Sequence, residues 1–365
     1  NQKFEYGEII GVSGGIRSDY SSAFGGGSKP FTFPRGDAYV RLSSFDFWKN
    51  GRLGDVLTEF KLRGAYGKAG IQPRSFDRYV VLNTANLGSN VAFTYPTSNP
   101  NPDLSVEISK EIEAGFDMTI KGLKGNWLSS INISATYWDH STCNAIYNVD
   151  AATSTGTGTI RDNAFGLASS GLQASLNANV VKSKNVSWNF ITNFSKQSSK
   201  ITSVKGGTEI IVISNAGSSN YVLRAGEKIG QLYGNLLLNA VDQLDPATGN
   251  PYIAKASQSN YTLASNGWVV DKATKQPFVT PNKVSFGDPN PKFNMSFMND
   301  VSFKGNFTVS MQWDWVHGSH LYNQTKQWMY RDGIHSDYAI PITIEGQTGA
   351  YTAFYRGVYA QVQAN

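Results

Sequence analysis

Aromatic rings gather in one long polar segment of the chain, 195–292. The residues that carry them stand among Asn, Gln, Ser and Asp: Tyr221, Tyr233, Tyr252, Tyr261 and Trp268. Flat aromatic faces beside amide and carboxylate groups suit sugar rings or peptide backbones. These five side chains are therefore the candidate substrate-binding residues. A folded surface loop whose rings pack on one another explains the same residues, and the sequence favours that explanation.

Two groups of polar residues resemble metal-ligand patterns. His317 and His320 are spaced as half of a helical metal site, but they follow a strand, where they would not share a face. A second segment concentrates oxygen ligands without the spacing of a calcium-binding loop: Asp242, Asp245, Thr248 and Asn250. A turn built from Asp-Pro and Gly-Asn accounts for that segment. We predict no metal site and no cofactor.

Four acidic residues fall on one face of a single predicted strand: Glu107, Glu111, Glu113 and Asp117. Paired carboxylates can hydrolyse glycosides. The wall of a water-filled lumen explains the four residues without catalysis. No motif for nucleophilic hydrolysis, zinc-dependent hydrolysis or nucleotide binding occurs in a workable context. We therefore predict no catalytic residues and no enzymatic activity.

The elements that must carry these residues alternate strictly between apolar and polar side chains. From Phe307 to Trp315 and from Leu172 to Val180, every second residue is apolar and the others are mostly uncharged and polar. Successive side chains on a strand point to opposite faces, so each ribbon has an apolar and a polar side. This pattern predicts an all-β, antiparallel transmembrane β-barrel with its apolar face toward lipid.

The prediction assigns individual residues to the two faces. The residues expected to face lipid are Ile131, Ile133, Leu172, Leu176, Val309 and Met311. The residues expected to face the interior are Asn132, Ser134, Asn177 and Gln312.

The composition agrees with a β-rich membrane protein. Aromatic residues make up 13% of the chain and charged residues only 16%, which favours strands. The net charge of +5 is spread along the chain without a basic run, so we predict no nucleic-acid partner. A single cysteine, Cys143, excludes a disulfide framework within the chain.

Ten segments have lengths that suit strands crossing a bilayer, about 9–11 residues. They are Glu8–Arg17, Ala38–Trp48, Thr58–Lys68, Glu107–Ile120, Trp127–Trp138, Gly171–Val181, Val186–Phe194, Phe293–Val301, Asn306–Val316 and Tyr351–Val362. Short connections rich in Gly, Asn and Lys alternate with long ones. The long connections are Ser18–Arg35, Ala69–Val106, His140–Ser170, Ser195–Lys292 and the residues from His317 onward. Outer-membrane barrels have short periplasmic turns and long extracellular loops, so the alternation predicts the sidedness.

Tryptophans stand near the ends of the predicted strands. Those next to short turns are Trp48, Trp127 and Trp188, and those next to long loops are Trp138, Trp313 and Trp315. Two aromatic belts at the two membrane interfaces would have this distribution. Packing in the core of a β-sandwich is the alternative explanation.

Several short segments resemble phrases of the SusC-like branch of TonB-dependent outer-membrane transporters from Bacteroidetes. They are Leu62–Gly70, Asn101–Leu104, Gly226–Gly234, Asp245–Asn250 and Gly287–Phe293. The resemblance extends to about Tyr330. It implies part of a plugged barrel of about 22 strands in the outer membrane, crossing it many times. It also implies a SusD-like surface lipoprotein as partner, TonB acting through the plug, and uptake of glycans or oligopeptides.

Residues 1–365 are therefore expected to form part of such a barrel, with the plug, the N-terminal domains and the final strands lying outside them. The first and last strands should then leave an open wall, because edge strands in lipid need partners. Two alternatives remain open from the sequence. One is a secreted β-sandwich or β-solenoid that binds glycans or acts as an adhesin, and the other is a β-rich glycan hydrolase.

Overall fold

The computed structural model describes residues 1–21, 23, 30–122, 125–207, 210–213, 220–246 and 248–349. The chain divides into two compact units. Unit 1 contains Asn1–Ile210, Arg224–Ile229 and Asn290–Ser319. Unit 2 contains Ile211–Leu223, Gly230–Pro289 and His320–Asn365. Among the described residues, no helix is long and apolar enough to cross a membrane.

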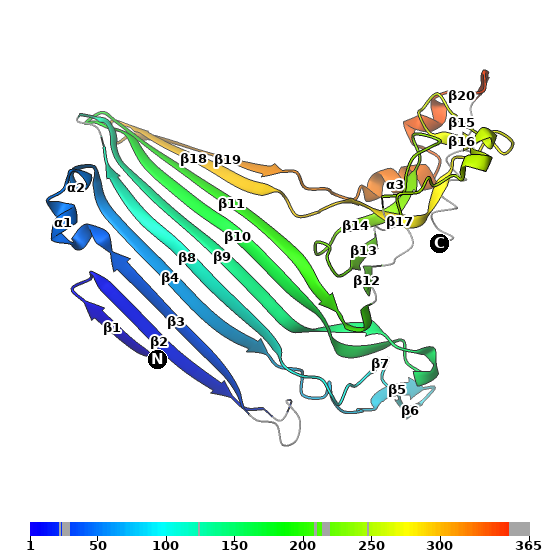
Figure 1. The fold of residues 1–365 in the computed structure, drawn as a ribbon, viewed down its shortest axis with the longest axis horizontal. Helices are drawn as coiled ribbons and strands as arrows, with labels where there is room; N and C mark the ends of the chain where they lie inside the picture. Colours follow the sequence, from blue (N-terminus) through cyan, green and yellow to red (C-terminus); the bar gives the residue numbers. More distant parts are fainter. Residues whose placement is uncertain are drawn as a thin grey trace. The chain divides into compact units, whose positions relative to one another are not determined.

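Unit 1 is built around one large antiparallel sheet (Figure 1). In spatial order its strands are β1 (Gln2–Tyr6), β2 (Ile10–Asp19), β3 (Phe31–Arg41), β4 (Leu57–Ile71), β8 (Glu107–Lys121), β9 (Trp127–Asp150), β10 (Thr159–Lys182), β11 (Val186–Val204), β18 (Phe293–Phe303) and β19 (Phe307–His317). A short strand, β7 (Ser98–Asn99), pairs in parallel with the start of β10. Within the described residues, β1 and β19 form the two edges of the sheet.

The register divides the large sheet into an apolar and a polar face. Directly paired residues share a face, and one row across seven strands is almost entirely apolar: Phe60, Met118, Ile133, Leu176, Thr192, Phe297 and Trp313. One residue away, the row on the opposite face is polar throughout: Lys61, Asp117, Ser134, Ser175, Asn193, Ser296 and Asp314. The predicted division of the strands into two chemically different faces is thus confirmed.

The short turns lie together at one end of the sheet. The amide of Lys182 donates to the carbonyl of Asn126 at 2.8 Å, and the amide of Lys304 donates to the carbonyl of Asn185 at 2.6 Å. These bonds link the β8–β9, β10–β11 and β18–β19 connections in a series. Figure 1 shows the same end carrying the helical connection between β3 and β4, with the hairpin of β5 and β6 at the other end. The predicted sorting of short connections to one rim is confirmed for these four.

Three of the predicted strand boundaries are wrong, because β9, β10 and β11 continue into segments expected to be loops. Both β9 and β10 are 24 residues long, so the expected loop His140–Ser170 is mostly ladder, closed by residues 151–158. Strand β11 likewise continues past Phe194 to Val204. Irregular pairing at Phe165 and Leu167 interrupts the alternation, which hides the strand from a search for a two-residue period. With about 9–11 residues sufficient to cross a bilayer, β9 and β10 reach well beyond it.

The first two predicted strands are also corrected. The strand expected at Glu8–Arg17 is β2, which begins two residues later, at Ile10, and ends at Asp19. Gly7 and Glu8 both have positive φ and form a type I′ turn that joins β2 to the preceding strand β1. The strand expected at Ala38–Trp48 ends at Arg41 instead. Short helices follow it: η2 (Leu42–Ser44), α1 (Asp46–Lys49) and α2 (Arg52–Val56). The alternation of apolar and polar residues stops at Leu42, so a strand continued beyond this point would not have one apolar and one polar face.

Hydrogen bonds tie the long connection between β4 and β8 to the start of β10. It contains a hairpin, β5 (Asn83–Leu87) with β6 (Asn90–Thr94). Both oxygens of the Asp77 carboxylate accept from Nη1 of Arg161 at 3.0 Å. Nδ2 of Asn101 donates to Asp162 at 2.9 Å, and Leu104 is fully buried. The segment Asn101–Leu104, which the resemblance singled out, is thus a structural anchor.

Unit 2 contains smaller sheets and short helices. A four-stranded sheet has the order β12 (Ile210–Ile213), β13 (Asn220–Leu223), β14 (Leu232–Leu237) and β17 (Val279–Gly287). Two hairpins pair β15 (Tyr261–Leu263) with β16 (Val269–Asp271), and β20 (Ile342–Ile344) with β21 (Gln347–Gly349). The longest helix among the described residues is α3 (Gln324–Arg331). The other short helices not yet named are η3 (Thr153–Thr155) and η4 (Lys205–Gly207) in unit 1, and η5 (Lys255–Asn260) and η6 (Ser336–Ala339) in unit 2. The strand expected at Tyr351–Val362 lies outside the described residues.

Candidate functional site: the polar face of the wall

The polar face of the large sheet is hollowed. One hollow of about 610 Å³ is lined by residues from β4 to β19, among them Arg63, Gln173, Asn193 and Asp314. A second hollow of about 700 Å³ extends from β4 to β11. Strands in a sheet lie about 4.8 Å apart, so strands as distant as β4 and β19 can line one hollow only if the sheet curves. The sheet therefore curls around its polar side.

Eight of the fifteen residues that line the first hollow carry uncharged hydroxyl or amide groups. They come from β9, β10, β11 and β18: Ser134, Thr136, Gln173, Ser175, Asn193, Ser195, Asn294 and Ser296. Such groups donate and accept hydrogen bonds without fixing a sign of charge. This part of the face can therefore bind water, hydroxyl-rich molecules or peptide groups.

Charged residues concentrate on the strands nearer the β1 edge. Arg63 lies 3.4 Å from the carboxylate of Asp117 and donates to the hydroxyl of Thr136 at 2.6 Å. Nδ1 of His140 lies 2.8 Å from Oε2 of Glu111. The polar lining thus changes from ion pairs on β4, β8 and β9 to the neutral groups of β10, β11 and β18 that line the first hollow.

The acidic residues considered for catalysis are part of this network. Glu111 pairs with His140 and Asp117 with Arg63, while Glu107 accepts from the backbone amide of Ile146 at 3.0 Å. Glu113 lines the second hollow, together with Glu111 and Arg63. These partners come from neighbouring strands, so the carboxylates tie the wall together, as the lumen-wall interpretation predicts.

The histidine and the arginine of this network, His140 and Arg63, are not among the candidate residues predicted from the sequence. The sequence predicts a loop at His140, and it places Arg63 in the strand Thr58–Lys68 and in the family-like segment Leu62–Gly70 without a role. The alternation of faces along the strand is the pattern that could identify His140, because from Ser134 to His140 every second residue of β9 is on the polar face. Extending the alternation past Trp138 would have placed His140 opposite Glu111.

The five candidate substrate-binding aromatics do not converge. Tyr252 and Tyr261 pack on a cluster formed by Leu238, Ile253 and Val269, while Trp268 packs on a different cluster with Val270 and Ile342. Tyr233 is buried in β14. For Tyr221 the structure gives the backbone position only, in β13 opposite Leu232. The observed packing is the one that the alternative of a self-packed loop predicts.

The oxygen-rich segment at Asp245 forms a turn. The Thr248 hydroxyl donates to its carboxylate at 3.2 Å, and the Tyr252 hydroxyl lies 3.5 Å from the other oxygen. Burial, followed by the neighbouring Asp245 charge, raises the pKa of the Tyr252 hydroxyl. Among the described residues, no group of three or more His, Cys, Asp or Glu side chains could hold a metal ion.

The two histidines of the His-x-x-His pattern have separate surroundings. The ring of His317 stacks on Phe293 with centroids 4.9 Å apart. Nδ1 of His320 lies 3.3 Å from the carbonyl of Asp288.

The six tryptophans expected in membrane belts occupy three kinds of position. Trp127, Trp188, Trp313 and Trp315 are on strands at positions that share the apolar face. Trp48 lies in α1, with its ring stacked on Phe60 of that face. Trp138 is on the polar face opposite Glu113, and its ring covers Gly171 so closely that an added Cβ would lie 2.6 Å from it. The position of Trp138 thus differs from the one a belt residue needs.

An open, curved, antiparallel wall with one apolar and one polar face defines a piece of a transmembrane β-barrel. The family model described as "TonB dependent receptor-like, beta-barrel" matches residues 4–215, more than half of the chain. The chain belongs to this family, whose members are outer-membrane β-barrel proteins. The expected membership of the TonB-dependent transporters is confirmed.

Relatives and solved structures agree with this assignment. TonB-dependent receptor P3 of Formosa agariphila is 23% identical over 334 residues, which cover 88% of this chain and 32% of the relative. TonB-dependent receptor P39 of the same organism is 24% identical over 317 residues, which cover 83% of this chain and 29% of that relative. The RagAB peptide importer in its closed-closed state has a similar fold, with a TM-score of 0.64 at 16% identity, covering 87% of this chain and 32% of that one. The chain thus spans about a third of the length of these proteins.

Proposed function

We propose that this chain forms part of the wall of an outer-membrane importer, with its apolar face in lipid and its polar face lining the lumen. The register carries the proposal, because apolar and polar rows alternate across seven consecutive strands. In a β-sandwich a second sheet would cover the apolar row. Here Trp313, Val309 and Leu172 remain exposed among the described residues.

Residues 1–365 account for only part of that wall in this proposal. Each unpaired backbone group in hydrocarbon costs several kcal/mol, so β1 and β19 need neighbouring strands on their open edges. Further strands of the receptor supply them, and a plug fills the enclosed space. The charged network around Arg63 and Glu111 suits contact with such a plug, since its groups are already held in ion pairs facing inward.

The proposed partners are TonB, acting through the plug, and a SusD-like surface lipoprotein over the outer rim. The rim opposite the short turns carries large exposed apolar side chains on the β5–β6 hairpin, Leu87, Val91 and Phe93. Exposed apolar patches of this kind mark contacts with other proteins. A capping lipoprotein would cover them.

The proposed cargo is a glycan or an oligopeptide. The hydroxyl and amide side chains that line the first hollow fit both, because each cargo presents many uncharged hydrogen-bonding groups. Similarity to the RagAB peptide importer is one of fold, and it is compatible with either cargo. Growth of a receptor-deletion strain on single oligosaccharides and on defined oligopeptides as sole nutrients will separate the two.

Orientation is tested by labelling single cysteines in intact cells with a membrane-impermeant maleimide. A cysteine replacing Val91 in the β5–β6 hairpin should react, and one replacing Ser183 in the β10–β11 turn should not. Labelling at position 183 with none at 91 would reverse the proposed topology. Lysed cells provide the control, since both positions should then react.

A further inference from the structure

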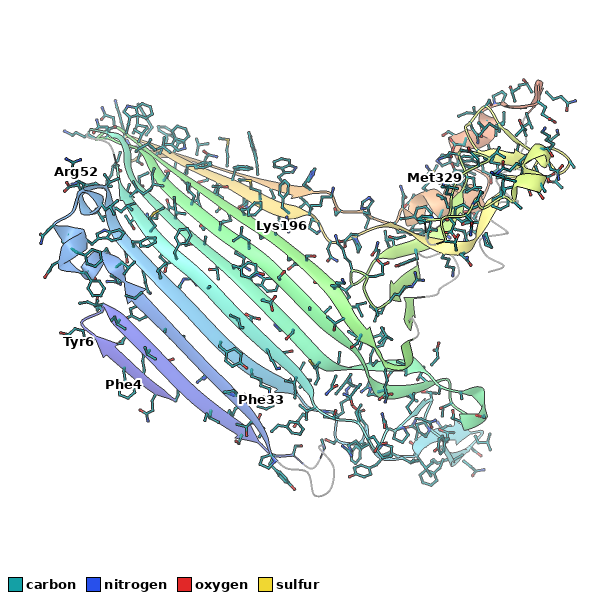
Figure 2. All side chains as sticks on the ribbon, in the orientation of Figure 1. Phe4, Tyr6, Phe33, Arg52, Lys196 and Met329 are labelled. Atoms are coloured by element: carbon teal, nitrogen blue, oxygen red, sulfur yellow. The ribbon has the colours of Figure 1, made fainter. Side chains whose placement is uncertain are left out.

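The connection between β3 and β4 differs from the three hairpin turns at the same rim because it is helical. It contains η2, α1 and α2, and Figure 2 marks it with the label of Arg52. Its apolar side chains are numerous for a segment of this length: Leu42, Phe45, Phe47, Trp48, Leu53 and Val56. A water-exposed turn needs none of them.

Trp48 fixes this connection to the apolar face of the wall. Its ring stacks on Phe60, with centroids 5.5 Å apart and planes 6° from parallel. Phe60 is in the apolar row, opposite Met118. Nε1 of Trp48 also donates to the carbonyl of Leu57 at 2.9 Å, which satisfies the indole while only 9% of the residue is exposed. The connection therefore folds over the outside of the wall, away from the polar face.

The backbone of Gly54 lies against the carbonyl of Trp48. A Cβ added to Gly54 would lie 2.4 Å from the carbonyl oxygen of Trp48. Glycine at this position lets α2 approach α1 closely. The two short helices thus pack closely against each other, next to the face that carries Phe60.

The exposed side chains of this piece are apolar residues, two cationic residues and two acidic residues, Asp46 and Asp55. Phe47 is 68% exposed, Leu53 59% and Val56 53%. Lys49 and Arg52 are exposed as well. Apolar side chains beside cations on a short helix are typical of segments that lie at the boundary between acyl chains and phosphate groups.

We propose that this connection is an interfacial anchor for phospholipid. Phe47, Leu53 and Val56 insert among acyl chains of the leaflet next to the short turns, and Lys49 and Arg52 contact lipid phosphates. Phospholipid is the occupant because the anchor is continuous, through Trp48 and Phe60, with the face that the wall turns to lipid. The inference rests on that proposed orientation of the wall.

The test uses the complete receptor, free of other cysteines, in nanodiscs of phosphatidylethanolamine and phosphatidylglycerol. Bimane is attached to Phe47→Cys or Leu53→Cys, and quenching is measured with lipid carrying a doxyl group on the acyl chain and with aqueous iodide. Lys184→Cys, in the exposed β10–β11 turn of the same rim, is the water-facing control. Leu176→Cys, on the apolar row, is the lipid-facing control. Heat-modified gel mobility verifies that each variant is folded.

The expected result is doxyl quenching at positions 47 and 53 that exceeds that at 184 by roughly twofold or more, with weak iodide quenching. Strong iodide quenching at 47 and 53, with position 176 still quenched by doxyl lipid, overturns the anchor and leaves the wall in place. A periplasmic protein as the true partner would give that same result, because it is absent from nanodiscs. Loss of doxyl quenching at 176 overturns the orientation of the wall itself.

Discussion

Replacing Leu176 with arginine tests the orientation of the wall at the depth where lipid is least tolerant of charge. Leu176 lies six residues before Lys182, the last residue of β10 at the short-turn rim. At about 3.3 Å per residue and a tilt near 40°, that distance corresponds to roughly 15 Å along the membrane normal. The hydrocarbon core is about 30 Å thick, so Leu176 lies near its midplane.

At this depth Leu176→Arg should cost about 2–4 kcal/mol, because the guanidinium must leave water or deform the bilayer to reach it. The unfolding equilibrium constant should then rise by roughly 30-fold to 1,000-fold. The assay is urea unfolding of the receptor folded into phospholipid vesicles, followed by tryptophan fluorescence. The same change at Leu172, closer to the opposite interface, should cost only about 0–1 kcal/mol.

Asn177→Arg is the matched control, since Asn177 follows Leu176 on the same strand but is on the polar face opposite Asn132. It should change the stability by less than about 0.5 kcal/mol. If Asn177→Arg destabilises the receptor as much as Leu176→Arg, or more, the assignment of faces is refuted.

Three further changes probe other parts of the structure. Gly171→Ala places a Cβ 2.6 Å from the Trp138 ring and should cost about 1–3 kcal/mol in the same unfolding assay, whereas adding Trp138→Ala should recover part of that loss. Arg161→Ala leaves the Asp77 carboxylate without its bidentate partner, so the β4–β8 connection should be cleaved faster by added protease, with a loss of about 1–3 kcal/mol. Backbone amides that donate to the Asp271 carboxylate hold its pKa in the folded protein below the ordinary value of 3.8. The ionised carboxylate therefore stabilises the fold above pH 3.8, and this stabilisation disappears as the pH falls through the lowered pKa of the folded protein. Asp271→Asn should flatten the curve of stability against pH over that range.

The sequence was sufficient for strands whose alternation is unbroken. The alternation from Leu172 to Val180 predicts the centre of β10, because every residue from Leu172 to Asn179 has a regular partner on both neighbouring strands. The continuation of β10 back to Thr159 was missed because register shifts near Phe165 break the two-residue period. Periodicity identifies a strand only where the ladder is regular.

Other features depend on contacts that a linear pattern cannot contain. The sequence predicts Trp48 at the end of a strand. In the structure it lies in the helix α1, and its position there depends on the stacking of its ring on Phe60. Trp138 reads as a belt residue until pairing with Glu113 assigns its face. The strands of unit 2 are mostly three to six residues long, too short for any period to be recognised, so its packed aromatics could only be listed as candidates.

The core of unit 2 joins two parts of the chain that flank one hairpin. Val270 precedes β18 in the sequence and Ile342 follows β19, yet both belong to one buried cluster. The chain that enters the β18–β19 hairpin and the chain that leaves it are therefore secured to each other. In a chimera between related receptors, grafting either segment alone would split this core, whereas transplanting both with their hairpin keeps it whole. Recombination should for the same reason move this region as a single cassette.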